Sequence, residues 1–187
     1  MNNSKKIIVA FGDSLTAGYG VPIENSYPFL LQKKLLDNGF NYKVINLGIS
    51  GDTTYNGLQR FNFVIKLKPK LVILTLGAND ALQKLSPKEA KNNLSKMIEQ
   101  LIKDKIKILL GGMYSPREHG PEYYNSFDSI YPNLAELFKL PLIPFFLEGI
   151  ALDSKYCLED NLHPNSEGYK KIVEENIWKY LQDLLVK

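Results

Sequence analysis

A serine and a histidine are the residues of this chain whose types and surroundings point most directly to chemistry. Ser14 follows the apolar run at residues 7–11 and lies in a Gly-Asp-Ser-Leu turn, while His163 stands three residues after Asp160. A serine hydroxyl is a weak nucleophile until an adjacent base removes its proton. Histidine can serve as that base, and an aspartate can orient it. These residue types predict hydrolysis of an acyl group through a serine nucleophile.

Each of the three residues also has an ordinary structural explanation. Ser14 is a suitable N-cap for a helix that starts after the turn. A single histidine beside a proline is by default a surface or core residue, and Asp160 is suited to an Asx-turn. Only the elements that position these residues can separate the two interpretations.

Short apolar runs alternate with longer segments of helical period along the chain. We predict strands at residues 7–11, 42–47, 71–76, 106–110 and 142–146, and helices at residues 26–38, 53–66, 87–102, 123–139 and 165–186. Strand–helix alternation with strands of buried type favours a parallel sheet that carries helices on both faces. The expected class is therefore α/β.

Local signals refine several of these boundaries. We expect Ser26 and Ser86 to act as N-caps, and the helix that follows Ser86 to bury one apolar stripe. We expect Pro132 to kink or break its helix and Pro144 to interrupt the last strand. The stripe after Ser86 consists of Ala90, Leu94, Met97, Ile98, Leu101 and Ile102.

Ligands of parallel α/β sheets bind at the carboxyl ends of the strands. That rule selects the turns at residues 12–15, 48–53 and 77–80, together with the region after residue 110. Gly51 permits close approach of a substrate to a backbone N–H, and Asn79 offers a side-chain amide. Both are candidate donors to an oxyanion, although an ordinary strand-to-helix turn and a turn asparagine remain alternatives.

The ordered set of serine, glycine, asparagine and Asp-x-x-His resembles the SGNH hydrolase superfamily, also called the GDSL esterases and lipases. Its four blocks match residues 12–15, Gly51, Asn79 and the pair Asp160/His163. Residues 50–53, 131–135 and 163–165 are further similar to the bacterial branch that contains the multifunctional acyl-CoA thioesterase I/protease I/lysophospholipase L1 and related arylesterases.

This resemblance implies a flavodoxin-like, three-layer α/β/α sandwich with about five parallel strands, formed as a single domain over residues 1–187. It implies no cofactor and an open cleft that accepts small esters or thioesters. It also implies a catalytic triad of Ser14, His163 and Asp160. The oxyanion hole would then consist of the Ser14 and Gly51 backbone N–H groups and the Asn79 amide.

Two other functions fit parts of the same pattern. One is a carbohydrate O-acetylesterase of the same superfamily. The other is a non-catalytic, flavodoxin-like binding module, although the glycines of this chain form no phosphate-binding G-x-G-x-x-G or P-loop pattern.

Composition excludes several classes of function. The 187 residues suit one sizeable core, and 44% hydrophobic with 23% charged residues is ordinary for a globular protein. The formal net charge is +3, with lysines spread along the sequence as on a solvated face, so no nucleic-acid partner is expected. One cysteine and two distant histidines cannot form a closed zinc site. These counts leave a carboxylate-based site open, but no calcium-loop spacing is present, so no metal site is expected. No apolar stretch reaches the ~20 residues of an integral membrane segment.

The N-terminal sequence only superficially resembles an export signal. Lys5 and Lys6 precede an apolar run that is too short and lacks a cleavage site, so we interpret it as a strand. The chain as it stands is expected to be cytoplasmic, and periplasmic or secreted if an export signal was removed. The sequence carries no indication of the oligomeric state.

Other polar residues near these turns are expected to have structural roles. Asp13, Asp52 and Asp80 are expected to hold their own turns by accepting backbone N–H groups. His119 is expected to take no direct part in the chemistry. The loop at residues 80–85 is expected to border the pocket and to shape acyl-chain preference.

Overall fold

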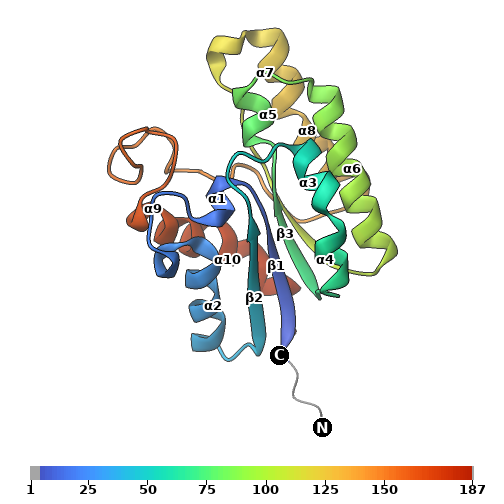
Figure 1. The fold of residues 1–187 in the computed structure, drawn as a ribbon, viewed down its shortest axis with the longest axis vertical. Coiled ribbons are helices and arrows are strands. Elements are labelled where there is room, and N and C mark those ends of the chain that lie inside the picture. Colours follow the sequence, from blue (N-terminus) through green and yellow to red (C-terminus); the bar gives the residue numbers. More distant parts are fainter. Residues whose placement is uncertain (1–4, 187) are drawn as a thin grey trace.

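The computed structural model describes residues 5–186 and contains one parallel sheet with the strand order β2-β1-β3-β4-β5 (Figure 1). The strands are β1 (Lys6–Gly12), β2 (Tyr42–Gly48), β3 (Leu71–Thr75), β4 (Lys107–Gly111) and β5 (Leu142–Ile143). The predicted parallel α/β sheet of about five strands is confirmed.

Helices cover both faces of the sheet. One layer holds α2 (Tyr27–Asp37), α9 (Ser166–Lys171) and α10 (Trp178–Leu181), and the other holds α3 (Thr54–Arg60), α4 (Asn62–Lys66), α6 (Pro87–Lys103) and α8 (Ile130–Phe138) (Figure 1). Three further helices lie at the carboxyl end of the sheet: α1 (Ser14–Ala17), α5 (Ala78–Leu82) and α7 (Pro121–Asp128).

The central strands form the middle of the core. Every residue of β3 is buried, as are residues 8–12 of β1, because both faces of these strands are covered by helices. A strand covered on both faces has no polar side and therefore appears in sequence as a continuous apolar run. The strand pattern was predictable for this reason.

The segment predicted as one helix over residues 53–66 is two helices that meet at Phe61. Around this residue the backbone hydrogen bonds join residues three positions apart, as in a 3-10 helix. The N–H of Phe61 donates to Leu58 O, and the N–H of Val64 donates to Phe61 O. The break lets the Phe61 ring pack edge-on against Phe11 at a centroid distance of 5.5 Å. The prediction of a single helix was wrong because this tertiary contact has no local signal.

The predicted break at Pro132 occurs earlier, at Ser129, between α7 and α8. Pro132 lies in the first turn of α8, where its missing N–H has no intrahelical partner to lose. Pro144 has the expected effect, and β5 ends at Ile143 because a proline cannot donate to the strand ladder.

The C-terminal segment is not the uniform helix predicted over residues 165–186. A π-helical turn, Ile172–Ile177, separates α9 from α10, and a 3-10 turn, Gln182–Leu184, follows α10. The π turn carries Asn176, a buried residue whose amide donates to Phe146 O at 3.0 Å and Glu148 O at 3.1 Å.

Two details of the helix predictions also need correction. Ser26 stands at the N-cap of α2, but its hydroxyl donates to Ile23 O at 2.6 Å and does not cap the helix. Ile102 is 44% exposed, because it lies about 100° around α6 from the buried Leu101. Ser86 caps α6 as predicted, accepting the Glu89 N–H.

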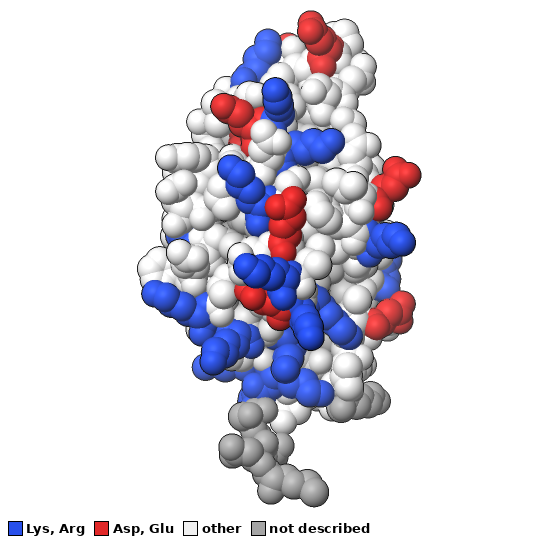
Figure 2. Space-filling view, turned by 90° about the vertical axis from the view of Figure 1, so that its right-hand side faces the viewer, with Lys and Arg blue, Asp and Glu red and all other residues white. Residues whose placement is uncertain are grey.

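The lysines are evenly spread in sequence but not in space. On the face shown in Figure 2, lysine and arginine side chains are denser toward the end of the molecule at which the strands begin. The ends of α4 and α6 and the turns that follow them contribute to this end, through Lys66, Lys68, Lys70, Lys103 and Lys105. Within residues 5–186, no helix combines the length and the apolar character needed to cross a bilayer.

The end of β3 depends on a buried hydroxyl from α8. Tyr131 is 1% exposed and donates to Leu76 O at 2.7 Å. Burial raises the pKa of Tyr131 well above its usual value, so this hydroxyl stays protonated and remains a donor. The Tyr131→Phe variant leaves a buried carbonyl without its donor, and we expect a loss of about 1–2 kcal/mol in the free energy of unfolding.

Denaturant unfolding measures this loss, with Tyr180→Phe as a control of identical chemistry. The Tyr180 hydroxyl has no protein partner among the described residues, so its removal should change stability little. Equal stability of the two variants would show that the Tyr131 bond does not stabilise the end of β3.

Candidate active site

Ser14 is the first residue of α1, and a single residue separates it from the end of β1 at Gly12. The N-cap of α1 is Asp13, whose Oδ1 accepts the Leu15 N–H at 3.0 Å, so the alternative of Ser14 as an N-cap is wrong. Asp13 holds its own turn as predicted. The serine side chain is thus carried on a fixed helical turn at the carboxyl end of the sheet.

Contacts with three neighbouring elements hold α1 in place. Thr16 Oγ1 lies 2.9 Å from Thr75 Oγ1 and 3.3 Å from Tyr27 Oη, which joins α1 to β3 and α2. Gly48 lies so close to α1 that a Cβ atom there would stand 2.2 Å from the backbone nitrogen of Ala17. Only glycine permits this approach of β2 to α1.

His163 lies beside Ser14 although 149 positions separate them in the chain. His163 Nε2 is 2.9 Å from Ser14 Oγ, and Nδ1 of the same ring is 2.6 Å from Asp160 Oδ2. The structure therefore brings the three residues together in the order serine, histidine, aspartate. The imidazole is 17% exposed, which keeps most of the ring out of water.

Asp160 has both of the roles considered for it. Its Oδ1 accepts the N–H groups of Leu162 and His163, each at 2.9 Å, which makes an Asx-type turn, while Oδ2 bonds the imidazole. Desolvation acts to raise the pKa of Asp160, but the bonds from His163 and Leu162 outweigh it and hold the pKa at about 2. The carboxylate is therefore ionised at neutral pH.

The loop that carries His163 is fixed at its base and along one side. An isolated antiparallel bridge pairs Cys157 with Pro164, and Leu158 N–H donates to His163 O at 2.8 Å. The Tyr19 ring lies 4.6 Å from the imidazole, centroid to centroid. In Figure 1 this orange loop runs beside the blue segment that follows α1.

Gly51 lies in the turn between β2 and α3. Its φ of +87° is in the left-handed region, and a Cβ atom added at this position would meet nothing within 4 Å, so backbone conformation rather than crowding calls for glycine. The turn is tied to β1 because Ile49 N–H donates to Gly12 O at 3.1 Å. Among residues 5–186, the backbone N–H groups of Ser14 and Gly51 donate to no other protein group.

Asn79 lies in α5, just beyond the end of β3. Its side-chain amide donates to Asp52 O at 2.9 Å, which links the turn after β3 to the turn after β2. Strand register brings these segments together, since Gly12 is level with both Gly48 and Thr75. The three predicted donor residues therefore follow three adjacent strands.

Asp52 and Asp80 act differently from the prediction that each holds its own turn. Asp80 accepts the backbone N–H and the hydroxyl of Thr54 on α3, at 2.8 and 2.6 Å. Asp52 pairs with Arg60. Burial raises the pKa of Asp80 against the opposing bonds from Thr54. Both carboxylates thus hold neighbouring elements against each other.

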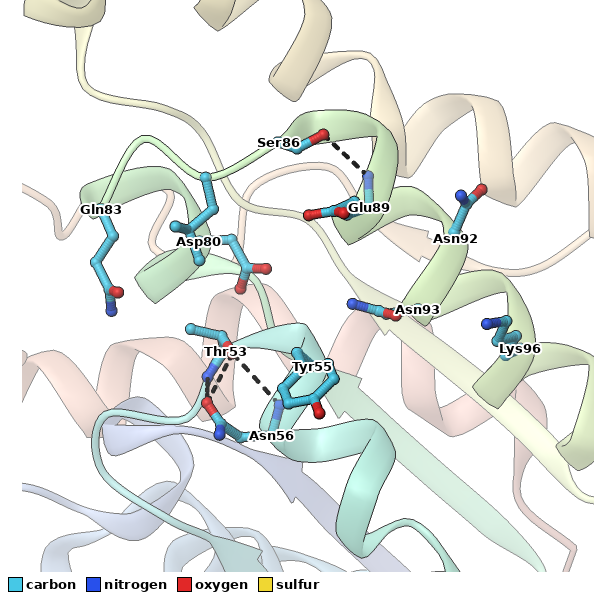
Figure 3. A pocket seen from close by; sticks show the side chains of 11 residues that line it. Thr53, Tyr55, Asn56, Asp80, Gln83, Ser86, Glu89, Asn92, Asn93 and Lys96 are labelled. Carbon is cyan, nitrogen blue, oxygen red and sulfur yellow. Dashed lines mark hydrogen bonds between the residues drawn. The ribbon is translucent and has the colours of Figure 1, made fainter.

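A polar cavity of about 650 Å³ lies between α3, the loop after α5 and the start of α6 (Figure 3). Its lining includes Asp80, Gln83 and Leu85, so the loop at residues 80–85 borders this cavity. Ser14 and His163 are not among its lining residues. The paired hydroxyl and imidazole do not line this cavity, which adjoins the turns of Gly51 and Asn79 through Thr53 and Asp80.

His119 lies away from this pair, in a 3-10 turn (Arg117–His119), with its ring edge-on to Tyr123 at 5.3 Å. The Tyr123 hydroxyl bonds Asp80 O and Leu85 O, which holds the loop at residues 80–85. Within residues 5–186, no three histidine, cysteine or acidic side chains are grouped as they would be to hold a metal ion.

Chemically, the site combines a hydroxyl, an imidazole within hydrogen-bond distance of it, and an ionised carboxylate on the far ring nitrogen. Free backbone N–H groups lie in the adjacent turns. The sequence predictions missed Tyr19 and the Thr16–Thr75–Tyr27 cluster, because nothing in the local sequence shows that these side chains meet.

Known proteins with similar sequences and structures are esterases. The model of the GDSL-like Lipase/Acylhydrolase family matches residues 10–171, a range that includes all four sequence blocks. An arylesterase of Vibrio mimicus is 44% identical over 173 residues, which cover 91% of this chain and 86% of that protein.

Two further similarities span nearly the whole chain. The thioesterase 1/protease 1/lysophospholipase L1 of Escherichia coli is 32% identical over 179 residues, covering 95% of this chain and 84% of that protein. The crystal structure of TesA superposes with a TM-score of 0.91 at 35% identity, covering 96% of this chain and all of that one.

The buried carboxyl next to Ser14 gives a testable pH dependence. Asp13 is fully buried and its Oδ2 has no partner among the described residues. Burial raises the pKa of Asp13 from 3.8 to about 7, with Asp52 and Asp80 adding to the effect and the Leu15 N–H opposing it. Between about pH 4 and 7, the folded state retains a proton that the unfolded state has released, so stability falls as pH rises.

The Asp13→Asn variant lacks this titration. The native protein should lose about 3 kcal/mol of unfolding free energy between pH 5 and pH 8 that the variant does not lose, because each pH unit below the raised pKa is worth about 1.4 kcal/mol. The difference in stability between variant and native protein should therefore shift by that amount in favour of the variant. Urea unfolding at several pH values measures it, with Asp183→Asn as a control at an exposed site. Parallel pH profiles for Asp13→Asn and the native protein would contradict the raised pKa.

Proposed function

The chain belongs to the GDSL-like lipase/acylhydrolase family and is a serine esterase, and on this premise we propose that Ser14 is its nucleophile. His163 is the general base in this proposal, and Asp160 orients and stabilises it. The supporting observation is the continuous chain of contacts from Ser14 Oγ to His163 Nε2 at 2.9 Å and from Nδ1 to Asp160 Oδ2 at 2.6 Å.

In the first step, His163 Nε2 accepts the hydroxyl proton while Ser14 Oγ forms a bond to the substrate carbonyl carbon. The resulting imidazolium donates its Nδ1–H as a hydrogen bond to Asp160, which remains a carboxylate. The low pKa of Asp160 supports this division of roles, because the proton stays on the imidazole. The carbonyl oxygen becomes an oxyanion.

The oxyanion is bound by the backbone N–H groups of Ser14 and Gly51 and by the Asn79 amide. The two backbone groups have no competing acceptor within residues 5–186, and the contact between Asn79 and Asp52 O fixes the amide in place. Donors that are already oriented stabilise developing charge without reorganisation, and a single one typically contributes about 10²–10³ in kcat.

The tetrahedral intermediate then collapses as the carbon–oxygen or carbon–sulfur bond to the leaving group breaks. The His163 imidazolium protonates the departing alkoxide or thiolate, which leaves the acyl group esterified to Ser14. Water enters, His163 removes its proton, and hydroxide attacks the acyl carbon. Collapse of the second intermediate returns the proton to Ser14 and releases the carboxylic acid.

The substrates in this proposal are small carboxylic esters, thioesters and lysophospholipids, as the names of the relatives indicate. The whole chain, residues 1–187, acts as one catalytic domain without a cofactor.

Substitution of Ser14 or His163 tests the catalytic assignment. We expect Ser14→Ala and His163→Ala to be about equally inactive, because members of one catalytic unit do not contribute additively. A fluorophosphonate probe should label the native protein once and fail to label Ser14→Ala. Ser95→Ala, on α6, is the matched control and should keep full activity and labelling.

Labelling of Ser14→Ala would show that another residue is the nucleophile. Substantial activity of His163→Ala would point to a different base. Circular dichroism of each variant distinguishes loss of chemistry from loss of the fold.

A substrate panel tests the proposed substrate class. Short and long p-nitrophenyl esters, an acyl thioester and a lysophospholipid should all be hydrolysed, and all activities should disappear together in Ser14→Ala. Hydrolysis restricted to acetylated sugars would instead identify a carbohydrate O-acetylesterase. No turnover of any ester would favour a binding module.

A further inference from the structure

Arg60, the last residue of α3, bonds three different segments through a single guanidinium group. Its Nε donates to Asp52 Oδ2 at 2.5 Å, Nη1 donates to Leu47 O at 2.8 Å, and Nη2 donates to Gly12 O at 2.9 Å. The acceptors belong to the turn after β2, to β2 itself and to β1. The side chains of Arg60 and Asp52 are 16% and 12% exposed, so water competes little for these bonds.

Two of the three acceptor residues, Gly12 and Asp52, lie close in the chain to a proposed oxyanion donor. Gly12 precedes Ser14 by two residues, and Asp52 follows Gly51. The carbonyl of Asp52 accepts the Asn79 amide at 2.9 Å. The guanidinium therefore bonds residues that neighbour Ser14 and Gly51 in the chain, one of which also accepts the Asn79 amide.

The chemistry of the guanidinium suits this task. It presents five N–H donors in a rigid plane, so it can hold several acceptors in a fixed relation, which a flexible ammonium group cannot do. Its Cζ atom also lies 4.3 Å from the centroid of the Phe11 ring, which adds a cation–π contact to the hydrogen bonds. A Thr53–Asn56 capping box starts α3 and fixes the helix that carries Arg60.

We propose that Arg60 is a positioning residue for the oxyanion hole. By fixing the ends of β1 and β2 and the turn at Asp52, it keeps the Ser14 and Gly51 N–H groups and the Asn79 amide directed at one point. This inference rests on the proposed function of those three donors. A displacement of about 1 Å in such a site can lower the rate on the order of 10²-fold.

The test compares the native protein with Arg60→Ala and Arg60→Lys. In both variants kcat should fall on the order of 10²-fold while KM changes little, because the donors contact the oxyanion and not the ground-state carbonyl. Affinity for a trifluoromethyl ketone, which forms a tetrahedral adduct with the serine, should fall by the same factor as kcat/KM. Affinity for the matching methyl ketone should not change.

Chemical rescue separates positioning from general stability. Millimolar methylguanidinium should restore much of the kcat of Arg60→Ala without affecting the native protein. The matched control is Arg117→Ala, which removes the only other arginine of the sequence, one that pairs with Asp128 and is 55% exposed. That control should retain native kcat and show no response to methylguanidinium.

End-point fluorophosphonate labelling counts the folded active sites of each variant, so kcat refers only to folded protein. Native kcat and native trifluoromethyl ketone affinity in labelled Arg60→Ala would overturn the inference, as would equal losses for both ketones. Failure of the proposed function has a different signature, since the native protein itself would then resist labelling at Ser14.

Discussion

The site depends on the parallel pairing of β1 between β2 and β3. In this register Gly12 is level with Gly48 on one side and Thr75 on the other, so three strands end together at one edge. Parallel strands all point the same way, and the turns that follow them must share that edge. Ser14, Gly51 and Asn79 are near one another because each comes shortly after one of these strand ends.

Three aspartates lie close to this edge of the sheet, and a different interaction limits the effect of each carboxylate. Burial raises the pKa of Asp13 to about 7, Asp80 bonds both donors of Thr54, and Asp52 pairs with Arg60. Uncompensated negative charge close to a developing oxyanion would oppose the proposed reaction. The pairing and the raised pKa limit that charge while the carboxyl oxygens still tie the turns together.

His163 is carried by a loop and does not follow directly from the end of a strand. Its loop follows β5 and is held by the bridge between Cys157 and Pro164 and by the start of α9, where Asn165 accepts two backbone N–H groups. Contact with Tyr19 closes the loop against the segment after α1. The nucleophile and the base therefore lie on separate supports, one formed by the sheet and one by the loop.

The sequence by itself determined the strand–helix alternation, the parallel sheet and the residue types of the proposed site. Hydrophobic period, capping residues and glycine turns act over a few neighbouring residues, so they can be recognised locally. Only the tertiary structure decided the break at Phe61, the π turn at Asn176 and the three bonds of Arg60. Those features are set by partners far away in the chain, whose proximity exists only after the sheet and its helices have packed.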